Sequence, residues 1–523
     1  MKTSGPLTLT ASLDRPRIAR GQPTRVHLVT ELVATADRPA KLRPPLALVL
    51  ALDSSGSMAG EKLRHVVRSV EFLVEQLQPE DQLGLVCFAN TARVLLPLTR
   101  ADRRIAPLAQ AALGQLRAVG GTNVEAGLRF SHRVLASGHQ DAQSSVLLLS
   151  DGVPNSGAVT PLTLGALARE LRGAVSISTL GYGEDHDDSV LGELAESGGG
   201  TYSYVAAPEL CRVELARAVG TRFELAADQV TEAFGPGRGV RVERVLGAAA
   251  PARVGADGLE APVADLGLAE RRLLTFVLTV EPYAELGPAT LGHLRVRFRP
   301  AGGAASAVES LVTAEVVETA GALDPDANAR RLLCSAVEAR AEATRLAGQQ
   351  QFEQAEAGLL EVIEEIRRAP VSAASARLDE VREQLLDDAE LMGQRPGPEA
   401  QRAFRRGQRA TPAQPQASPA LLDAAFSQVP AARLVFLKGM PGRDVPLQRE
   451  MVLGRTPDAD LQLPGSGVSR RHTRIVAAEG GYWVNDLGSS NGTFLNGAPV
   501  DCQRLRDGDV VGVGEFRFVY RER

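Results

Sequence analysis

Residues 46–58 read LALVLALDSSGSM, and this stretch decides the fold of the region around it. Its first seven residues are apolar without interruption, which is typical of a strand buried on both faces of a parallel sheet. The pattern then changes to Asp53, Ser55 and Ser57, three oxygen-bearing side chains spaced two residues apart. Residues 61–78 follow with apolar side chains at helical spacing. A buried strand that ends in a polar turn and leads into a helix indicates an α/β domain.

The alternation of strand and helix patterns continues to about residue 220. Further strand patterns lie at 82–88, 145–150, 174–180 and 200–205, and further helical patterns at 102–117, 123–136, 160–171, 187–196 and 207–220. Strands that alternate with helices build βαβ units and a doubly wound sheet. We therefore expect a Rossmann-like α/β domain over residues 44–222.

Two other segments of this domain carry oxygen ligands. Asp151 follows the buried strand at 145–150, and Thr122 follows the glycine pair at 120–121. Open α/β sheets bind ligands beyond the carboxyl ends of their strands, so we expect both residues to lie near Asp53, Ser55 and Ser57. Carboxylates and hydroxyls without a nearby His or Cys favour Mg²⁺, or Mn²⁺, over zinc. With so few charged ligands, such an ion keeps a position that a partner's acidic group can fill.

Residues 44–222 resemble a von Willebrand factor A (VWA) domain. Its metal-ion-dependent adhesion site (MIDAS) is matched, in order, by Asp53, Ser55, Ser57, Thr122 and Asp151. The resemblance implies direct ligation by the serines and Thr122, partly water-mediated contact by the aspartates, and a ligand acidic group in the remaining position. The acidic segment 183–188 has two interpretations: it tunes metal affinity or partner choice, or it is a plain helix start capped by Asp187 or Asp188.

Strand patterns of period two flank the α/β domain on both sides. They lie at 7–13 and 24–33 before it, and at 240–246, 273–280, 291–298 and 308–318 after it. The N-terminal hairpin alone would be marginally stable. We therefore expect a discontinuous β-sandwich of residues 1–43 plus 228–318, with the α/β domain inserted into it.

Two segments of different composition follow the sandwich. Residues 325–392 are rich in Ala, Leu, Glu and Arg at helical spacing and predict a helical hairpin, either plain or similar to one tetratricopeptide repeat that offers a partner groove. Residues 393–430 are rich in Pro, Gln, Ala and Arg and predict a linker.

From residue 432 onward, short strands separated by Gly, Asn and Asp turns predict an all-β domain. Arg455 follows one strand and offers a planar fork to phosphate oxygens. Ser469, Arg470 and His472 lie together in a second loop, and Ser490 and Asn491 in a third. The G-x-S-x-G pattern at 488–492 continues into a strand rather than a helix, which argues against a hydrolase nucleophile.

Residues 432–523 resemble a forkhead-associated (FHA) domain, a class that reads phosphothreonine. The resemblance implies phosphate contacts by Arg455 and Ser469, flanking contacts by Arg470 and Ser490, and contacts of Asn491 with the peptide backbone. His472 is expected to be structural and to brace the Ser469 loop. Thr411, in the predicted linker after several arginines, suggests a further hypothesis: once phosphorylated, it would compete with outside partners for these loops.

Composition narrows the remaining possibilities. The chain of 523 residues has a net charge of -5 and only 4% aromatic residues, which argues against nucleic-acid binding. It has no run of about 20 apolar residues, which argues against membrane insertion. Four widely separated cysteines favour a reducing compartment and hence the cytoplasm. The abundance of Ala, Gly, Leu and Arg with few Lys favours a bacterial source.

The sequence also has no recognisable nucleophile–base set, so we expect a protein that is not an enzyme. The favoured interpretation is a signalling adaptor that binds an acidic protein ligand through Mg²⁺ and phosphothreonine proteins through the C-terminal domain, with a Ser/Thr kinase as a further expected partner. The alternative is an accessory subunit of an AAA+ ATPase or chelatase-type complex. The oligomeric state is not predicted.

Overall fold

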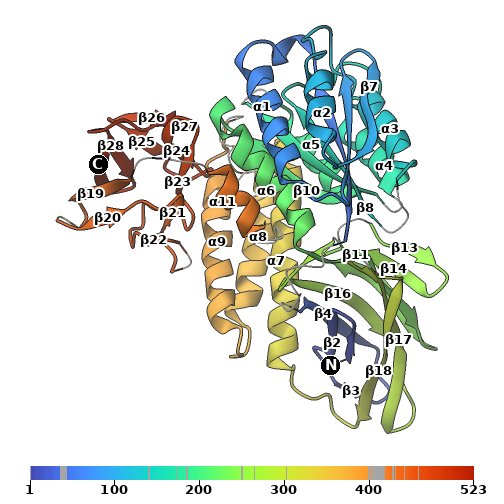
Figure 1. Cartoon of the computed structure of the whole chain (residues 1–523). Coiled ribbons are helices and arrows are strands. Elements are labelled where there is room, and N and C mark those ends of the chain that lie inside the picture. Colours follow the sequence, from blue (N-terminus) through green and yellow to red (C-terminus); the bar gives the residue numbers. More distant parts are fainter. Residues whose placement is uncertain are drawn as a thin grey trace. The chain divides into compact units, whose positions relative to one another are not determined.

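The computed structural model describes most of the chain as two compact units (Figure 1). The described residues are 2–35, 44–138, 142–172, 175–183, 186–248, 251–263, 265–301, 303–397, 401, 404, 418–426, 429, 431–440, 442–457 and 459–522. One unit is Met1–Arg43 with Leu225–Gln401, and the other is Pro44–Glu224 with Arg402–Arg523. No helix among these described residues is both long and apolar enough to cross a membrane.

The second unit begins with the predicted doubly wound α/β domain. Its sheet has the strand order β10-β9-β8-β5-β6-β7, and all neighbours are parallel except β6 and β7. The strands are β5 (Leu46–Asp53), β6 (Gln82–Phe88), β7 (Ala92–Arg100), β8 (Gln143–Ser150), β9 (Val175–Tyr182) and β10 (Gly199–Val205). The helices are α1 (Glu61–Gln76), α2 (Ile105–Leu113), α3 (Val124–Leu135), α4 (Pro161–Arg172), α5 (Asp188–Gly198) and α6 (Cys211–Phe223).

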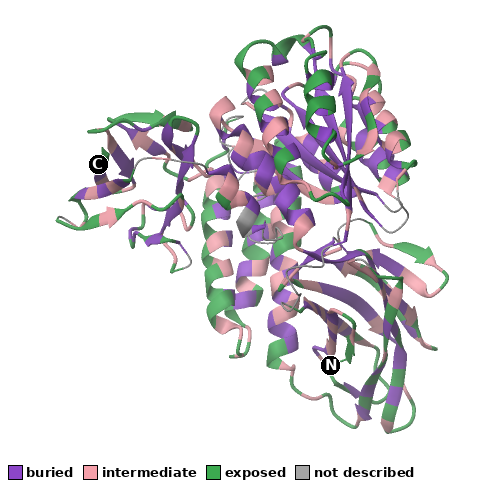
Figure 2. Cartoon of the chain, in the orientation of Figure 1, coloured by how far each residue is buried: buried purple, intermediate pink, exposed green. Residues whose placement is uncertain are grey.

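Strand β5 shows why this sheet is covered on both faces. Leu46, Leu48, Leu50 and Leu52 pack in one core with residues of α1, α2 and α6. Ala47, Val49 and Ala51 pack in another core with residues of α3, α4 and α5. Because successive side chains of a strand point to opposite faces, the unbroken apolar run serves both cores. Figure 2 shows the resulting buried centre of the sheet.

Strand β7 is the element of this domain that the sequence did not predict. It is an antiparallel edge strand, largely exposed, and it contains Pro97. An edge strand needs no apolar face, and it tolerates a proline that a central strand excludes. Its sequence therefore carries a weak strand signal.

The first unit contains the predicted discontinuous β-sandwich. One sheet has the order β1-β2-β4-β16-β12, and the other β13-β14-β11-β17-β18-β3, with β15 beside β11. The N-terminal strands are β1 (Lys2–Ser4), β2 (Leu7–Leu13), β3 (Arg17–Ala19) and β4 (Thr24–Ala34). The later strands are β11 (Leu225–Pro236), β12 (Val240–Leu246), β13 (Arg253–Gly255), β14 (Gly258–Pro262), β15 (Leu266–Gly267), β16 (Arg271–Val280), β17 (Gly287–Pro300) and β18 (Ser306–Val317).

The helical region of this unit differs from the predicted hairpin. The structure has three helices there: α7 (Pro325–Gly348), α8 (Phe352–Arg367) and α9 (Ser375–Gly393). Helix α8 packs against both α7 and α9. The third helix was missed because a single amphipathic pattern does not show how many neighbours will cover it.

The predicted linker at 393–430 is also corrected at its C-terminal end, which belongs to the second unit. A short helix, α11 (Pro419–Ala425), lies there and packs on α6. Its proline occupies the first turn, where the missing N–H costs nothing. Thr411 lies outside the described residues, so the hypothesis about its phosphorylation stays a prediction.

The C-terminal all-β domain of the second unit consists of two sheets, ordered β20-β19-β29-β28-β25-β26 and β22-β21-β23-β24-β27. The strands are β19 (Ala432–Lys438), β20 (Asp444–Pro446), β21 (Glu450–Gly454), β22 (Leu461–Gln462), β23 (Thr473–Ala478), β24 (Gly481–Asp486), β25 (Thr493–Leu495), β26 (Ala498–Val500), β27 (Cys502–Arg504), β28 (Val510–Val513) and β29 (Phe516–Glu522).

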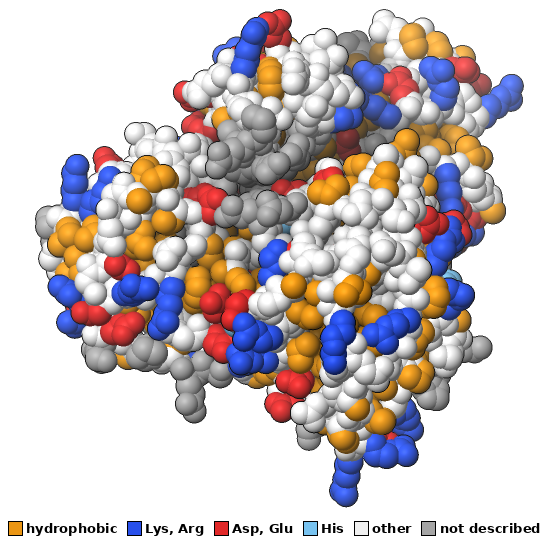
Figure 3. All heavy atoms as spheres, turned by 90° about the horizontal axis from the view of Figure 1, so that it is seen from above, with side chains coloured by type: hydrophobic (Ala, Val, Ile, Leu, Met, Phe, Trp, Pro, Cys, Tyr) orange, Lys and Arg blue, Asp and Glu red, His pale blue; other side chains and the backbone are white. Residues whose placement is uncertain are grey.

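In the face of the molecule that Figure 3 shows, basic and acidic side chains are interspersed, as the small net charge leads one to expect.

Candidate metal and phosphopeptide sites

The first candidate site lies at the carboxyl end of β5. Asp53 ends this strand, and its Oδ1 accepts a hydrogen bond from the Ser55 N–H at 2.7 Å, which folds the chain into a tight turn. The turn brings Oγ of Ser55 within 3.0 Å of Oγ of Ser57. Asp53 is fully buried and Ser55 nearly so, whereas Ser57 is exposed. The cluster of hydroxyls therefore opens to solvent at Ser57.

Asp151 joins the same cluster from the neighbouring strand β8. Oγ of Ser57 donates a hydrogen bond to Oδ1 of Asp151 at 2.7 Å. The preceding residue, Ser150, donates from its Oγ to Oδ2 of Asp53 at 2.5 Å. Parallel pairing of β5 with β8 aligns the carboxyl ends of both strands, so the two carboxylates reach one edge of the sheet.

Thr122 lies beside these residues on a loop held by backbone hydrogen bonds. Its N–H donates to Oδ1 of Asn155 at 2.9 Å, and its carbonyl oxygen accepts from the Asn155 N–H at 3.0 Å. A Cβ atom added to Gly152 would lie 2.9 Å from Oγ1 of Thr122. Glycine at position 152 therefore lets Thr122 approach the residue directly after Asp151.

Lys62, on the first turn of α1, is a functional candidate that sequence reasoning missed. Its Nζ donates to Oδ2 of Asp151 at 2.5 Å, and its side chain is partly exposed. A lysine on a helix surface has no sequence signal that separates it from an ordinary solvated residue. Only the structure shows that it adds a positive charge at the mouth of the cluster.

Charge and spacing at the cluster suit a hard cation. Burial raises the pKa of Asp53 to about 6, against the opposing hydrogen bonds from Ser150 and Ser55. The hydroxyl oxygens of Ser55 and Ser57 are 3.0 Å apart, and that of Ser57 is 2.7 Å from Oδ1 of Asp151, so oxygens of all three residues converge. The donors are all hydroxyls and carboxylates, so the residues present fit Mg²⁺ or Mn²⁺.

The acidic segment 183–188 is described only in part, since residues 184 and 185 lie outside the described residues. Asp187 is the N-cap of α5, and its Oδ1 accepts from the N–H groups of Ser189 and Val190. His186 bonds to Tyr202, and the Tyr202 hydroxyl donates to Asp188. The described part of this segment thus has the geometry of the helix-start interpretation.

The second candidate site is formed by three loops at one end of the C-terminal domain. The Arg455 N–H donates to the carbonyl oxygen of Ser469 at 3.0 Å, which joins the first loop to the second. The Ser490 N–H donates to Oγ of Ser469 at 3.1 Å, which joins the second to the third. The three loops that the sequence singled out therefore meet at Ser469.

Close backbone approach makes this meeting possible. A Cβ atom on Gly454 would lie only 1.6 Å from the carbonyl oxygen of Arg470. Glycine before Arg455 is therefore a steric requirement. It places Arg455 and Arg470 on adjacent segments, and both side chains are partly exposed.

His472 is buried beneath these loops. Its Nδ1 accepts from the Ser469 N–H at 2.9 Å, and its Nε2 lies 3.0 Å from the carbonyl oxygen of Gly492. Burial lowers the pKa of His472, against the opposing effects of the Gly492 carbonyl and Asp486. A neutral ring that carries its proton on Nε2 satisfies both hydrogen bonds, so His472 lies where a brace between two of the loops is needed.

Asn491 is exposed at the rim of the same site. Its Nδ2 donates to the carbonyl oxygen of Gly467 at 3.0 Å. Among the described residues, no hydrogen bond to its Oδ1 is formed. The internal bond orients the amide, and the carbonyl side remains available to a peptide N–H.

Comparison with known proteins identifies both domains. Residues 47–211 match the model of the von Willebrand factor type A domain, and residues 451–514 match that of the FHA domain. Residues 47–211 therefore form a VWA domain and residues 451–514 an FHA domain, and both resemblances are confirmed. Domains of these two kinds mediate protein interactions, and FHA domains bind phosphothreonine proteins.

The chain is similar to curated proteins over parts of its length. It is 31% identical over 203 residues to the uncharacterized protein sll0103 of Synechocystis, which covers 39% of this chain and 47% of that protein. It is 46% identical over 67 residues to the glycogen accumulation regulator GarA of Mycolicibacterium smegmatis, which covers 13% of this chain and 42% of GarA. The chain thus spans less than half the length of each of these relatives.

A solved structure extends the likeness in fold. The von Willebrand factor type A protein of Catenulispora acidiphila superposes with a TM-score of 0.57 at 21% identity, over 74% of this chain and 91% of that one. At this identity the match shows the fold alone. The superposed region, 74% of this chain, is longer than the VWA domain of residues 47–211.

Proposed function

We propose that this protein is a non-enzymatic signalling adaptor in the cytoplasm with two binding sites. The VWA site holds Mg²⁺ or Mn²⁺ through Asp53, Ser55, Ser57, Thr122 and Asp151, and the ion binds an acidic group of a protein partner. The FHA loops bind phosphothreonine on a protein that a Ser/Thr kinase has modified. The observation that carries the proposal is the meeting of the three FHA loops at Ser469, with Arg455 and Arg470 on either side.

The FHA loops supply donors suited to a phosphate dianion. Arg455 offers a planar fork, Ser469 a hydroxyl and Arg470 a second positive charge. Each charge-assisted hydrogen bond contributes about 1.5–3 kcal/mol. Asn491 adds contacts to the peptide backbone, which carry no phosphate dependence. A phosphopeptide should therefore bind, and its unphosphorylated form should not.

Titration of the full chain with a phosphothreonine peptide tests this site. Arg455→Ala should weaken binding by about tenfold to a hundredfold, since about 1.4 kcal/mol is tenfold. Arg455→Lys should recover only part of the affinity, because an ammonium lacks the planar fork. Arg521→Ala is the matched control, since Arg521 is exposed in the same domain and pairs with Asp507. Wild-type affinity in Arg455→Ala would contradict the placement of the phosphate.

At the VWA site, the bound ion would supply a Lewis-acidic position for a carboxylate oxygen. The chain's own residues hold and orient that position: Ser55 and Ser57 provide hydroxyls on the β5 turn, Thr122 a third from its loop, and Asp151 a carboxylate from β8. Lys62 sets the charge beside them. The ligand set contains only two carboxylates, so the affinity for Mg²⁺ should be weak to moderate.

Calorimetric titration with Mg²⁺ tests this second site. Ser57→Ala and Asp53→Asn should each abolish measurable heat of binding, because each removes a ligand or its orienting carboxylate. Ser57→Ala is the cleaner variant, since Ser57 is exposed whereas Asp53 is fully buried. Asp102→Asn is the control, because Asp102 is an exposed acid of the same domain, paired with Arg104. Unchanged Mg²⁺ uptake by Ser57→Ala would exclude this site.

A further inference from the structure

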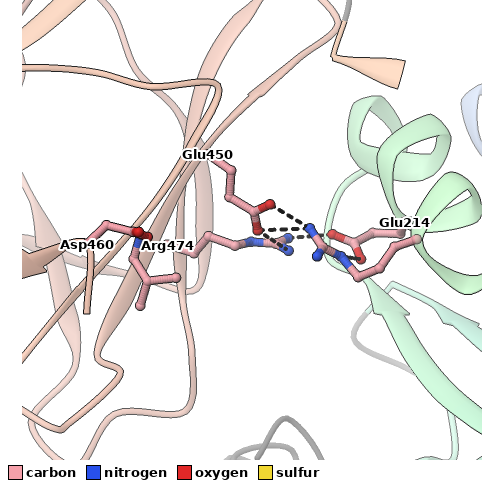
Figure 4. Close-up of polar contacts among 6 residues, drawn as sticks. Glu214, Glu450, Asp460 and Arg474 are labelled. Carbon is pink, nitrogen blue, oxygen red and sulfur yellow. Dashed lines mark hydrogen bonds and ion pairs between the residues drawn. The ribbon is translucent and has the colours of Figure 1, made fainter. Parts of the chain in front are cut away.

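Four charged side chains meet where the FHA domain lies against helix α6, within the second unit (Figure 4). Arg474 of β23 donates to Glu214 of α6 at 2.5 Å. Arg217 of α6 donates from Nη2 to both oxygens of Glu450, at the start of β21, at 2.8 Å each. Each domain thus contributes one acid and one base, and we call these four residues the charge cluster.

The distances within the charge cluster favour pairing across the two domains. Inside the VWA domain, Arg217 and Glu214 are 3.4 Å apart, and inside the FHA domain, Arg474 and Glu450 are 3.5 Å apart. The pairs that cross between domains are closer, at 2.5 and 2.8 Å. The side chains are therefore oriented toward the other domain rather than toward their own partner.

Because these charged side chains are buried, each of them would destabilise the protein if its partner were missing. The side chains of Glu214 and Arg474 are only 4% and 10% exposed. A charge removed from water needs a nearby opposite charge, and loss of one member of a buried pair leaves the other uncompensated. The charges of Glu214 and Glu450 raise the pKa of Arg474 despite its burial, so it stays protonated.

Further contacts around the charge cluster enlarge the surface that the FHA domain shares with its neighbours in the second unit. Toward α1, Glu479 accepts from Arg68 at 3.0 Å and lies 3.4 Å from Nδ1 of His65. On the other side, α11 packs on α6, and the Ser418 N–H donates to the carbonyl oxygen of Gly220 at 3.2 Å. Arg449 of the FHA domain in turn donates to Asp423 of α11 at 3.1 Å.

The same two FHA strands carry this surface and the phosphopeptide loops. Strand β21 begins with Glu450, and Arg455 directly follows its other end. Strand β23 contains Arg474 two residues after His472. The position of the loops relative to the VWA domain is therefore set by the same strands that carry the charge cluster.

We propose that the FHA domain docks on helix α6 of its own VWA domain through the charge cluster, so that the two binding sites form one rigid unit rather than two tethered heads. The occupant of this FHA surface is the chain's own α6, whose acid and base match the FHA base and acid. The inference does not depend on what either site binds.

Cys502 provides a native reporter of docking. It lies on β27 next to the charge cluster, and the neighbouring charges that act on its thiol include Arg474 of its own domain and Glu209 and Glu214 of the VWA domain. The other three cysteines, Cys87, Cys211 and Cys334, are buried, whereas Cys502 is at intermediate exposure. Undocking would expose the Cys502 thiol, and its rate of alkylation by a maleimide, followed by peptide mass spectrometry on the full chain, measures this.

A double-mutant cycle separates docking from general damage. Glu214→Leu and Arg474→Met each leave one unpaired charge in the cluster and should speed labelling of Cys502 about a hundredfold to a thousandfold, the size expected for breaking a buried pair. The double variant keeps Arg217 with Glu450 and restores neutrality, so its labelling should return close to the wild-type rate. Arg521→Met, at an exposed ion pair of the same domain, should label like wild type.

Two outcomes would overturn the proposal. Equal labelling rates in wild type and both single variants would show that the charge cluster does not hold the FHA domain on α6. Fast labelling in the double variant as well as the single ones would show that charge balance does not hold them together. Slow labelling of Cys87 and an unchanged fluorescence of Trp483, the single tryptophan, verify that the VWA and FHA domains of each variant are folded.

Discussion

At the scale of the residue, His472 shows how one buried side chain organises a binding surface made of loops. It has no exposed surface, and its two ring nitrogens bond to the Ser469 and Gly492 backbones. These bonds require a neutral ring, because protonation of Nδ1 would remove the acceptor of the Ser469 N–H. The order of the loops around Ser469 and Gly492 should therefore depend on pH.

We expect the stability of the FHA domain to fall as pH drops below about 6.5. The pKa of His472 is lower in the folded domain, so the unfolded chain takes up the proton first, and stability is full above the unfolded pKa and lost below it. In a plot of the free energy of unfolding against pH, this residue contributes a slope of at most about 1.4 kcal/mol per pH unit. Urea unfolding followed by Trp483 fluorescence between about pH 7.5 and 5 measures it.

The control for this prediction is His472→Gln, which cannot titrate in this range. Its profile should be flatter than that of the wild type by the contribution of one proton. If the wild type and His472→Gln lost stability in parallel, other groups would cause the pH dependence.

At the scale of the element, helix α3 shows how packing overrides helix propensity. Gly127 is the fourth residue of this helix, and glycine within a helix is usually unfavourable. A Cβ atom there would lie 2.7 Å from Cδ1 of Phe88, whose ring is fully buried at the end of β6. The missing side chain lets α3 pack closely on the sheet, next to the Asp53 edge.

Gly127→Ala should therefore destabilise the VWA domain, although alanine is the better helix former by about 1 kcal/mol. The overlap with a buried ring should cost about 1–3 kcal/mol, the range for overpacking in a core. Gly358→Ala in α8 is the matched control, because no heavy atom beyond the neighbouring residues and backbone of its own helix lies within 4 Å of the added Cβ. It should be neutral or stabilising, and thermal unfolding of both variants tests the contrast. Stabilisation by Gly127→Ala would show that the packing is looser than described.

At the scale of the whole molecule, the sandwich of the first unit depends on strands that are far apart in the sequence. Strand β4 pairs with β2 on one side and with β16 on the other. Five N-terminal residues lie fully buried in its core: Leu7, Leu9, Val26, Leu28 and Leu32. The first 35 residues therefore contribute to the stability of the β-sandwich, whose other strands begin at residue 225.

Deletion of residues 1–35 should unfold the sandwich. Each large buried side chain contributes about 1.5–3 kcal/mol, so the loss of five is comparable with the whole stability of a domain. Hydrogen exchange of β16 should become fast in this variant. A chain truncated before residue 432 is the control, because its missing strands belong to the other unit. Retained protection of β16 after the N-terminal deletion would contradict this account of the fold.

The sequence by itself determined the elements whose physics is local. The unbroken apolar run at 46–52 predicted a central strand, because a short strand covered on both faces buries every side chain. That the candidate residues of each site lie close together was also predictable, since turns that follow neighbouring strands present their polar groups at the same edge of the sheet. The loop motifs around 469 and 490 were recognisable for the same reason, whereas the steric need for glycine at 454 became clear only from the structure.

Only the tertiary structure decided the features that depend on distant partners. The number of helices in 325–393, the short helix α11 and the edge strand β7 depend on what covers them, which no local pattern records. Lys62 at Asp151 and the charge cluster of Glu214, Arg217, Glu450 and Arg474 were not visible in advance. From the sequence alone, a charged residue is expected to be exposed to solvent. Its burial is tolerated only when folding places an opposite charge beside it.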